Sequence, residues 1–443
     1  MSATFPANGP ALSFQGNTMD TFQGRKRRHP VATRSIHADD LHMQDWVAPG
    51  AMVAWGQAGA EPVTLTAALM RDRHAIGGFR AGIGLTLSEA ASPAFGDAVR
   101  FISYCASANN RRLAKAGMLD ILPVPYSQFA SALQPVDVLM LHLPPADKNG
   151  RHSLGLVQEY LLPLIGSARI IIAEINDQMP YVFGEASIAT DEIDAIISTS
   201  RPLLELPPIV PGPIEKQVAH NVAGLIDDGS TLQLGLGQIP EAVLDALVQH
   251  RSLGVHSGVI GDGVATLMET GVINNACKPV NTGVTVTGWL LGSRRLYEFA
   301  RENPAILVCG THYTHDPAVL ASQNKLAAIN SAIEVDLTGQ INAETVGSSY
   351  VGGVGGAADF IRGAHRSPGG LPIIALPSTV ATSGKSRIVA RLSGPVSTPR
   401  SEAGLIVTEH GVADLRGRSL HERRKLMLAI AAPEHREQLE QEK

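Results

Sequence analysis

Short apolar runs alternate with amphipathic stretches through most of the chain. Residues 51–55 form an apolar run of strand length, and a turn that contains two glycines follows it at 56–61. Pro62 then opens a stretch in which apolar residues recur at helical spacing, namely Val63, Leu65, Ala68 and Leu69. A strand, a glycine turn and a helix in this order form the repeating unit of parallel α/β sheets.

Further β-rich apolar runs follow, with helical or loop segments between them. They lie at 101–104, 136–141, 169–173 and 195–198. This rhythm predicts a mainly parallel sheet that is covered by helices. Residues 206–213 hold four prolines, which can continue neither a helix nor the interior of a sheet. They predict a stiff, extended connection between two domains.

The opening unit is repeated after these prolines. Residues 231–234 read as a strand, a glycine turn follows at 235–237, and Pro240 opens a helix with one apolar face. We therefore expect two similarly built α/β domains with mainly parallel sheets, at 38–210 and 214–443. Residues 1–37 show no period and are rich in Ser, Thr, Gly, Pro and Asn, so they predict a disordered tail. Its basic cluster at 25–28 is interpreted as solvating the tail rather than as a localisation signal.

Composition narrows the class of protein. The chain of 443 residues is 44% hydrophobic and 17% charged, which is ordinary for a globular protein that can bury large cores. A net charge of −5 without a basic stripe argues against nucleic acid as a partner. Three cysteines without paired spacing indicate reduced thiols and no zinc site. Because no apolar run approaches about 18 residues and no signal peptide is visible, we expect a cytoplasmic protein with no membrane span.

Glu61 stands in the first glycine turn, one residue before the proline of the first helical turn. Glycines let backbone N–H groups approach a ligand closely, and a helix N-terminus favours negative charge. The turn is therefore suited to anionic ligands, and Glu61 places a carboxylate on it. The alternative interpretation is that Glu61 only caps the helix, and the turn alone leaves both open.

Other motifs are incomplete. The stretch 235–240 begins like a dinucleotide fingerprint, but its third glycine position is Pro240. Residues 382–386 end like a phosphate loop whose first glycine is missing. His312 and His315 precede a proline at a strand-to-loop transition, so structural or substrate-facing roles are favoured over a metal site. No Gly-x-Ser-x-Gly elbow is present, so the motif that carries the nucleophile of such serine hydrolases is absent from the sequence.

Four glycines fall within residues 352–356. Such a cluster is entropically costly and is expected where backbone must closely approach a ligand or another chain. This cluster completes a set of five ordered motifs: GLGQIP at 235–240, GVHSGVIGDG at 254–263, NSAIEVDLTGQ at 330–340, GGVGGAADF at 352–360 and VTEHGVADLRG at 407–417.

Together these motifs resemble the acetyl-CoA hydrolase/transferase family, the class I CoA-transferases that include 4-hydroxybutyrate and itaconate CoA-transferases. The resemblance covers about residues 45–436. It implies two α/β domains that face each other across an active-site cleft, with CoA bound along the cleft. It also implies a homodimer or larger homo-oligomer that uses a CoA thioester as substrate and holds no tightly bound cofactor.

One departure from the family pattern concerns the nucleophile. Family members carry a nucleophilic glutamate two residues after the histidine of the Gly-x-His segment, and this chain has Gly258 there. Asp262 lies four residues on, between two glycines, where a turn-forming role suffices. Either the protein is catalytically inactive, or another carboxylate reaches the same point from the facing domain. We predict Glu61 for that role.

The resemblance also assigns the remaining roles. It implies that the protein moves CoA between a short-chain acyl-CoA and a carboxylic acid of the 4-hydroxybutyrate, butyrate or itaconate type, through a glutamyl-CoA thioester. The expected oxyanion- and CoA-binding residues are Gly355, Gly356, Gly235, Gly237 and Gln238, and the expected substrate-binding residues are His315 and Gly258. An acyl-CoA thioesterase and a non-catalytic CoA-binding protein remain alternatives, since the same groups would serve a hydrolase.

Overall fold

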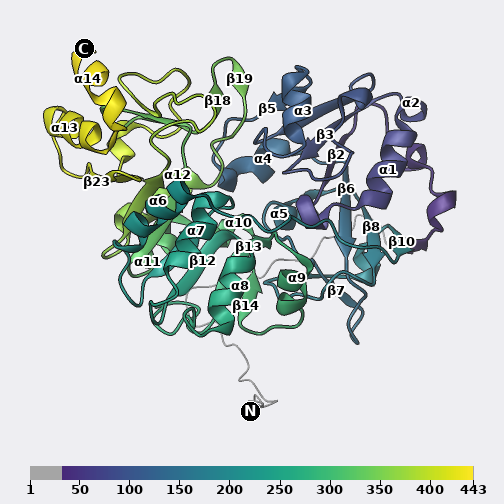
Figure 1. Ribbon diagram of the computed structural model, residues 1–443. Helices are drawn as coiled ribbons and strands as arrows, with labels where there is room; N and C mark the ends of the chain where they lie inside the picture. The colour runs from purple at the N-terminus through teal and green to yellow at the C-terminus, as the bar shows by residue number, and fades with distance from the viewer. Residues whose placement is uncertain (1–31, 443) are drawn as a thin grey trace.

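Two large sheets form the centres of two domains in the computed structural model, which describes residues 32–442 (Figure 1). The first sheet has eight strands, all parallel, in the order β1-β10-β8-β6-β2-β3-β4-β5. Their bounds are β1 Arg34–Ser35, β2 Met52–Trp55, β3 Phe79–Ile83, β4 Val99–Ser103, β5 Leu119–Ile121, β6 Val138–Leu143, β8 Ile170–Asn176 and β10 Ala195–Thr199. Every residue of β2 and β6 is buried, as in a parallel sheet whose faces are both covered.

The second sheet also has eight strands, in the order β14-β13-β12-β11-β15-β20-β22-β23. Only its last pair is antiparallel. The bounds are β11 Thr231–Leu234, β12 Gly254–Ile260, β13 Thr285–Leu290, β14 Ile306–Val308, β15 Leu326–Asn330, β20 Leu371–Ala375, β22 Leu405–Thr408 and β23 Gly411–Asp414. The prediction of two α/β domains with mainly parallel sheets is confirmed.

The repeated unit occurs at corresponding places in the two sheets. β2 leads through a short 3-10 turn to helix α1 (Val63–Arg71), and β11 leads to helix α7 (Gln238–Ala246). Residues 200–212, which include three of the four prolines, contain no helix or strand and connect β10 to helix α6 (Pro213–Ala223). No helix within residues 32–442 is long and apolar enough to cross a membrane.

The predicted tail lies mostly outside the described residues, which begin at residue 32. Its last part is ordered, because Arg34 and Ser35 pair in parallel with Ala195 and Ile196 of β10. The prediction of disorder is wrong for these two residues. A strand of two residues is too short to produce a sequence period. These residues form a strand only because they pair with the edge of β10.

One segment of the first domain pairs with the second sheet. β14 accompanies only the first half of β13, and residues 156–158 run antiparallel to its second half. Gln158 N donates to Gly288 O at 3.1 Å, and Leu290 N donates to Leu156 O at 2.9 Å. The apolar side chains around this junction belong to one core cluster that is shared by both domains. The pairing therefore fixes the two domains against each other.

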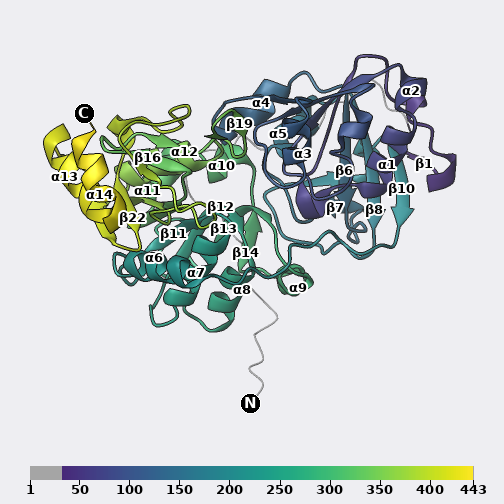
Figure 2. The ribbon, with the colours of Figure 1, turned by 45° about the horizontal axis from the view of Figure 1, so that its top comes forward.

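The glycine cluster at 352–356 forms a second junction. It lies between the hairpin β18–β19 (Thr345–Val346 and Ser349–Tyr350) and helix α12 (Ala357–Arg366), and the hairpin reaches the first domain near α3, Asn110–Lys115 (Figure 2). Ala106 N donates to Gly352 O at 2.9 Å, and Tyr126 N donates to Gly355 O at 3.0 Å. A Cβ added to Gly353 would lie 2.6 Å from Tyr104 O. Close approach of two backbones thus accounts for part of this cluster.

Candidate active site

A cavity of about 170 Å³ lies between the two domains. The first domain supplies three side chains to its wall, and the second supplies residues from the ends of β11, β12, β13 and β15 and from the start of α12. The wall consists of Tyr104, Tyr126, Glu159, Gln233, Leu234, Gly235, Gly258, Val259, Trp289, His315, Asn330, Gly356, Ala357 and Phe360. The carboxyl ends of parallel strands are the usual place for a ligand in such sheets.

Four of the predicted site residues meet in this wall: Gly235, Gly258, His315 and Gly356. They come from three motifs and one separate loop, and only the fold brings them together. A Cβ added to Gly235 would meet nothing within 4 Å, so this backbone faces open space.

The other predicted glycine-loop residues stand beside the cavity. Gly237 is the N-cap of α7 with φ of 127°, a backbone conformation that favours glycine, and Gln238 is exposed. Gly355 does not line the cavity, and its carbonyl accepts a hydrogen bond from Tyr126 N. Its neighbour Gly356 therefore lies closer to the cavity than Gly355 does.

The structure places Glu61 outside this wall. Its fully buried carboxylate accepts hydrogen bonds from Leu87 N at 2.6 Å and Ser88 N at 3.2 Å on Oε1, and from Ser88 Oγ at 2.5 Å on Oε2. Burial raises the pKa of Glu61 to about 7, and these donors only partly oppose that rise. Glu61 thus fastens the loop after β3, and its nucleophilic role stays a prediction.

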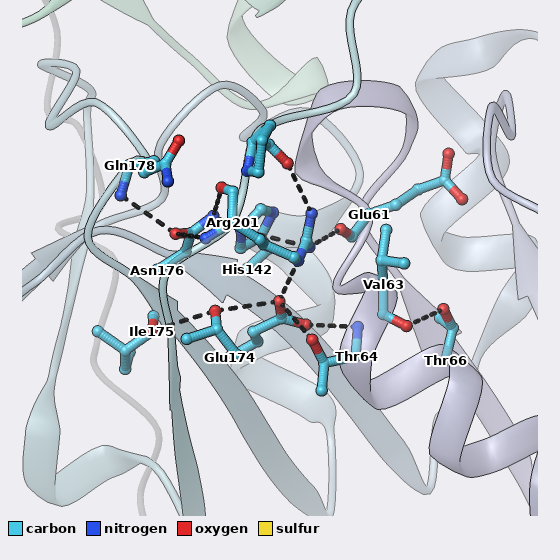
Figure 3. A network of polar contacts seen from close by, with 12 residues as sticks. Glu61, Val63, Thr64, Thr66, His142, Glu174, Ile175, Asn176, Gln178 and Arg201 are labelled. Carbon is cyan, nitrogen blue, oxygen red and sulfur yellow. Dashed lines mark hydrogen bonds and ion pairs between the residues drawn. The ribbon is translucent and has the colours of Figure 1, made fainter. Parts of the chain in front are cut away.

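The helix-capping interpretation of Glu61 is wrong, because Glu174 performs that task. Glu174 Oε2 accepts from Thr64 N at 2.9 Å in the first turn of α1, and Glu174 Oε1 accepts from Arg201 Nε at 2.5 Å. Arg201 also donates to the backbone carbonyl of Glu61 at 2.9 Å. Figure 3 shows the Glu61 side chain leaving this network and its carboxylate pointing away from Arg201. The network holds the main chain of Glu61.

Glu159 is the acidic side chain that lines the cavity, and the sequence motifs did not indicate it. It directly follows the segment that pairs with β13. Its Oε2 accepts from Tyr126 Oη at 2.8 Å and from Gln57 Nε2 at 2.5 Å, whereas its Oε1 has no hydrogen-bond partner within residues 32–442. Burial holds the pKa of Glu159 well above its usual value, against the two donors that lower it.

Glu159 Oε1 and the carbonyl oxygen of Gly258 both lie beside Gly288. A Cβ added to Gly288 would stand 2.7 Å from Gly258 O and 3.2 Å from Glu159 Oε1. A signal in the sequence could have found this residue. Glu159 is the only charged residue in the mostly apolar stretch 154–165, and an ionisable group buried in such a stretch is a candidate for function.

His315 occupies the other side of Gly258. Its ring packs against Tyr126 and Phe360, with centroids 5.5 and 4.6 Å apart. A Cβ added to Gly258 would lie 3.3 Å from His315 Nε2 and 3.2 Å from Cε1, and one added to Gly356 would lie 2.6 Å from Nε2. The ring therefore fills the space in which a side chain at position 258 would begin.

Thr314 engages one ring nitrogen of His315. Its hydroxyl oxygen lies 2.8 Å from His315 Nδ1 and 3.2 Å from Gly310 O. Nε2 is the ring nitrogen that faces Gly258 and Gly356. Burial lowers the pKa of His315 to about 3, so the ring is neutral at physiological pH. His315 thus directs Nε2 toward the cavity and brings no positive charge.

These groups can support acyl transfer to a carboxylate. A carboxylate with one uncommitted oxygen lies beside glycine backbone in a small, partly apolar cavity, where water competes less as a nucleophile. No group of three His, Cys, Asp or Glu side chains within residues 32–442 could hold a metal ion. The three cysteines are free thiols, two of them buried and Cys277 exposed.

Comparisons with known proteins agree with this chemistry. Residues 292–443 match the acetyl-CoA hydrolase/transferase C-terminal domain. The chain is 38% identical over 399 residues to 4-hydroxybutyrate coenzyme A transferase of Clostridium kluyveri, an alignment that covers 87% of this chain and 92% of that protein. The structure of RipA from Yersinia pestis superposes with a TM-score of 0.87 at 32% identity, covering 92% of this chain and 96% of that one. A 4-hydroxybutyrate CoA-transferase from Porphyromonas gingivalis gives a TM-score of 0.77 at 32% identity, with 92% and 97% covered.

Proposed function

The chain belongs to the acetyl-CoA hydrolase/transferase family and is a CoA-transferase, and on this premise we propose that it moves CoA between short-chain acyl groups in the cavity between its domains. One observation carries the proposal: glycine loops from three family motifs converge on a cavity that contains a carboxylate. The cavity, of about 170 Å³, has room for a small acyl group. Relatives named for 4-hydroxybutyrate support a short acid as substrate.

The reaction needs a carboxylate on the enzyme because a carboxylate can form both an anhydride and a thioester reversibly. It attacks the thioester carbonyl, the C–S bond breaks, and CoA leaves as the thiolate. The thiolate then attacks the enzyme's own carbonyl carbon in the anhydride, which releases the first acid and leaves an enzyme–CoA thioester. The acceptor acid reverses these two steps and leaves as its CoA thioester.

Backbone groups would stabilise the oxyanion of each tetrahedral intermediate. We assign this role to N–H groups near Gly355 and Gly356, and we assign contact with the thioester or the pantetheine arm to the loop of Gly235, Gly237 and Gln238. Gly235 and Gly356 line the cavity and support this assignment more strongly than the three residues beside it do. Preorganised N–H donors suit this role because they need not reorient during the reaction.

His315 would select substrates through Nε2, because Thr314 already engages Nδ1. A hydroxyl group can both donate and accept, so the hydroxyl of a hydroxy acid can pair with Nε2. We expect His315→Phe to lower kcat/KM for 4-hydroxybutyryl-CoA more than for butyryl-CoA. Equal losses for the two substrates would contradict this role.

A transfer assay distinguishes the proposal from its alternatives. Butyryl-CoA is incubated with isotopically labelled acetate, and labelled acetyl-CoA and free thiol are both measured over time. A transferase forms labelled thioester much faster than free thiol, and its initial rates give the parallel double-reciprocal lines of a ping-pong reaction. Release of free thiol at a rate that does not depend on the acetate concentration would indicate a thioesterase. CoA binding without either product would indicate a binding protein.

We also propose that the protein is cytoplasmic and assembles as a homodimer or larger homo-oligomer. Its free cysteines support a reducing compartment. Light scattering on the purified protein tests the assembly, since a monomer has a mass of 46.7 kDa. A mass equal to that of the monomer at all micromolar protein concentrations would refute the proposed oligomer.

A further inference from the structure

We infer that Glu159 is the nucleophilic carboxylate of the proposed transferase, whose chain has Gly258 at the position where the family pattern has a glutamate. The inference rests on the proposed function and names the residue that carries the covalent intermediate. It places the nucleophile on the first domain, opposite the strand on which the family pattern has it.

The main chain delivers Glu159 to this position from two sides. The preceding residue, Gln158, donates its N–H to Gly288 O at 3.1 Å, and the carbonyl of Glu159 accepts from Thr311 N at 3.4 Å. Both partners belong to the second domain. Glu159 also has φ of 22°, a conformation that residues with a side chain rarely adopt. Backbone strain of this kind is typical of functional sites, where the surrounding structure maintains it.

The side chain is held so that one oxygen stays free. Gln57 Nε2 and Tyr126 Oη both donate to Oε2. The Gln57 amide cannot rotate freely, because its own oxygen accepts from Leu85 N at 2.8 Å and from Tyr104 Oη at 3.1 Å. Oε1 has no hydrogen-bond partner within residues 32–442, and its side chain lines the cavity. It is therefore open to a substrate group that enters the cavity.

Glu61 differs in each of these respects. Its two oxygens already accept three hydrogen bonds, from Leu87 N, Ser88 N and Ser88 Oγ. It does not line the cavity that contains Gly258. An attack by Glu61 would require these bonds to break and the loop after β3 to move, whereas Glu159 Oε1 needs neither change.

The covalent step balances on Glu159 alone. Ionised Oε1 forms a bond to the thioester carbonyl carbon while the C–S bond breaks and its electron pair leaves with the CoA thiolate. The thiolate then forms a bond to Cδ of Glu159, and the bond between Cδ and the bridging oxygen breaks to release the acyl group as a carboxylate. No atom is oxidised or reduced, and no metal or other co-reactant takes part.

Borohydride trapping tests this inference. The full-length protein is incubated with butyryl-CoA, treated with borohydride and digested, because borohydride reduces a glutamyl-CoA thioester to an alcohol with a fixed mass loss on one residue. We expect the reduced residue to be Glu159 in the wild type and in Glu61→Gln. We expect no reduced residue in Glu159→Gln, whose transfer rate should fall on the order of a thousandfold or more.

Two further variants separate chemistry from folding. Glu185→Gln changes another carboxyl side chain at the domain junction, one that does not line the cavity, and should keep transfer within about twofold of the wild type. Glu159→Asp keeps the carboxylate and shortens its reach, so it should still be trapped at position 159 but more slowly. Far-UV circular dichroism and the thermal midpoint show that each variant is folded before its rate is compared.

The outcomes are distinct. Reduction of Glu61, or transfer by Glu159→Gln near the wild-type rate, would overturn the inference and leave the transferase function standing. A wild type that binds CoA but neither transfers nor becomes trapped would overturn the proposed function and the inference with it. Reduction of Glu159 alone, lost in Glu159→Gln, is the expected result.

Discussion

Gly258→Ala should destabilise the protein through His315, and this contact can be measured directly. The added Cβ would lie 3.2 and 3.3 Å from two atoms of the imidazole ring. That ring is buried between Tyr126 and Phe360 and is hydrogen-bonded to Thr314, so it cannot move aside freely. The backbone must absorb part of the strain.

The magnitude follows from two opposing effects. Overpacking a rigid core costs about 1–3 kcal/mol, and contacts that are only a few tenths of an ångström too short favour the lower end, about 1 kcal/mol. Replacing glycine by alanine also reduces the entropy of the unfolded chain, which stabilises by about 0.4–1 kcal/mol. The single variant could therefore look almost neutral. A double-mutant cycle removes the entropic effect because that effect is the same in both backgrounds.

The assay is urea unfolding of four proteins: wild type, Gly258→Ala, His315→Asn and the double variant. We expect a coupling free energy of about 1 kcal/mol, with alanine better tolerated once His315 is shortened. Gly235→Ala with His315→Asn is the matched control, since a Cβ on Gly235 meets nothing within 4 Å. A coupling at Gly258 no larger than that of the control would refute the steric role of His315.

Three other changes test the electrostatics of the described residues. Tyr126→Phe removes a donor to Glu159, so the pKa of Glu159 should rise further and the acid limb of the transfer rate should move to higher pH. A limb that does not move would contradict the ionised nucleophile. The pKa of Glu61 is about 7 in the folded protein, above the ordinary value of 4.5. The stability that the bound proton contributes is therefore fully present below pH 4.5 and is lost as the pH rises through 7. Urea unfolding should show wild type losing about 3 kcal/mol relative to Glu61→Gln between pH 4.5 and pH 8, and a constant difference would exclude the raised pKa. Arg201→Met should cost about 3–5 kcal/mol because it leaves buried Glu174 unpaired, whereas the double variant with Glu174→Leu should recover most of that loss.

Both domains could be predicted from the sequence because each of their central strands can be recognised from a short run of residues. A buried parallel strand is a continuous apolar run, so β2, β6, β8 and β10 are visible in the order of residues alone. The strand β1 was missed because its two residues are exposed and form a strand only through an existing edge.

Part of the candidate site could also be predicted from sequence motifs. Gly235, Gly258 and Gly356 lie in motifs that can be read along the chain, and so does the absence of a carboxylate at position 258. The sequence analysis favoured a replacement from the facing domain over Asp262. It could not say which acidic residue that is, since Glu61 stands in a suggestive turn and Glu159 stands in none.

The tertiary structure places Glu159, and not Glu61, in the wall of the cavity. Glu159 reaches the cavity because residues 156–158 pair with the free half of β13, a contact across more than a hundred residues of chain. Glu61 is turned toward Leu87 and Ser88 by the packing of its own loop. The sequence by itself determined the strands, the glycine turns and the missing nucleophile, which depend on local pattern. Only the packing of one domain on the other determined which carboxylate faces the cavity, because side-chain direction there is set by distant backbone.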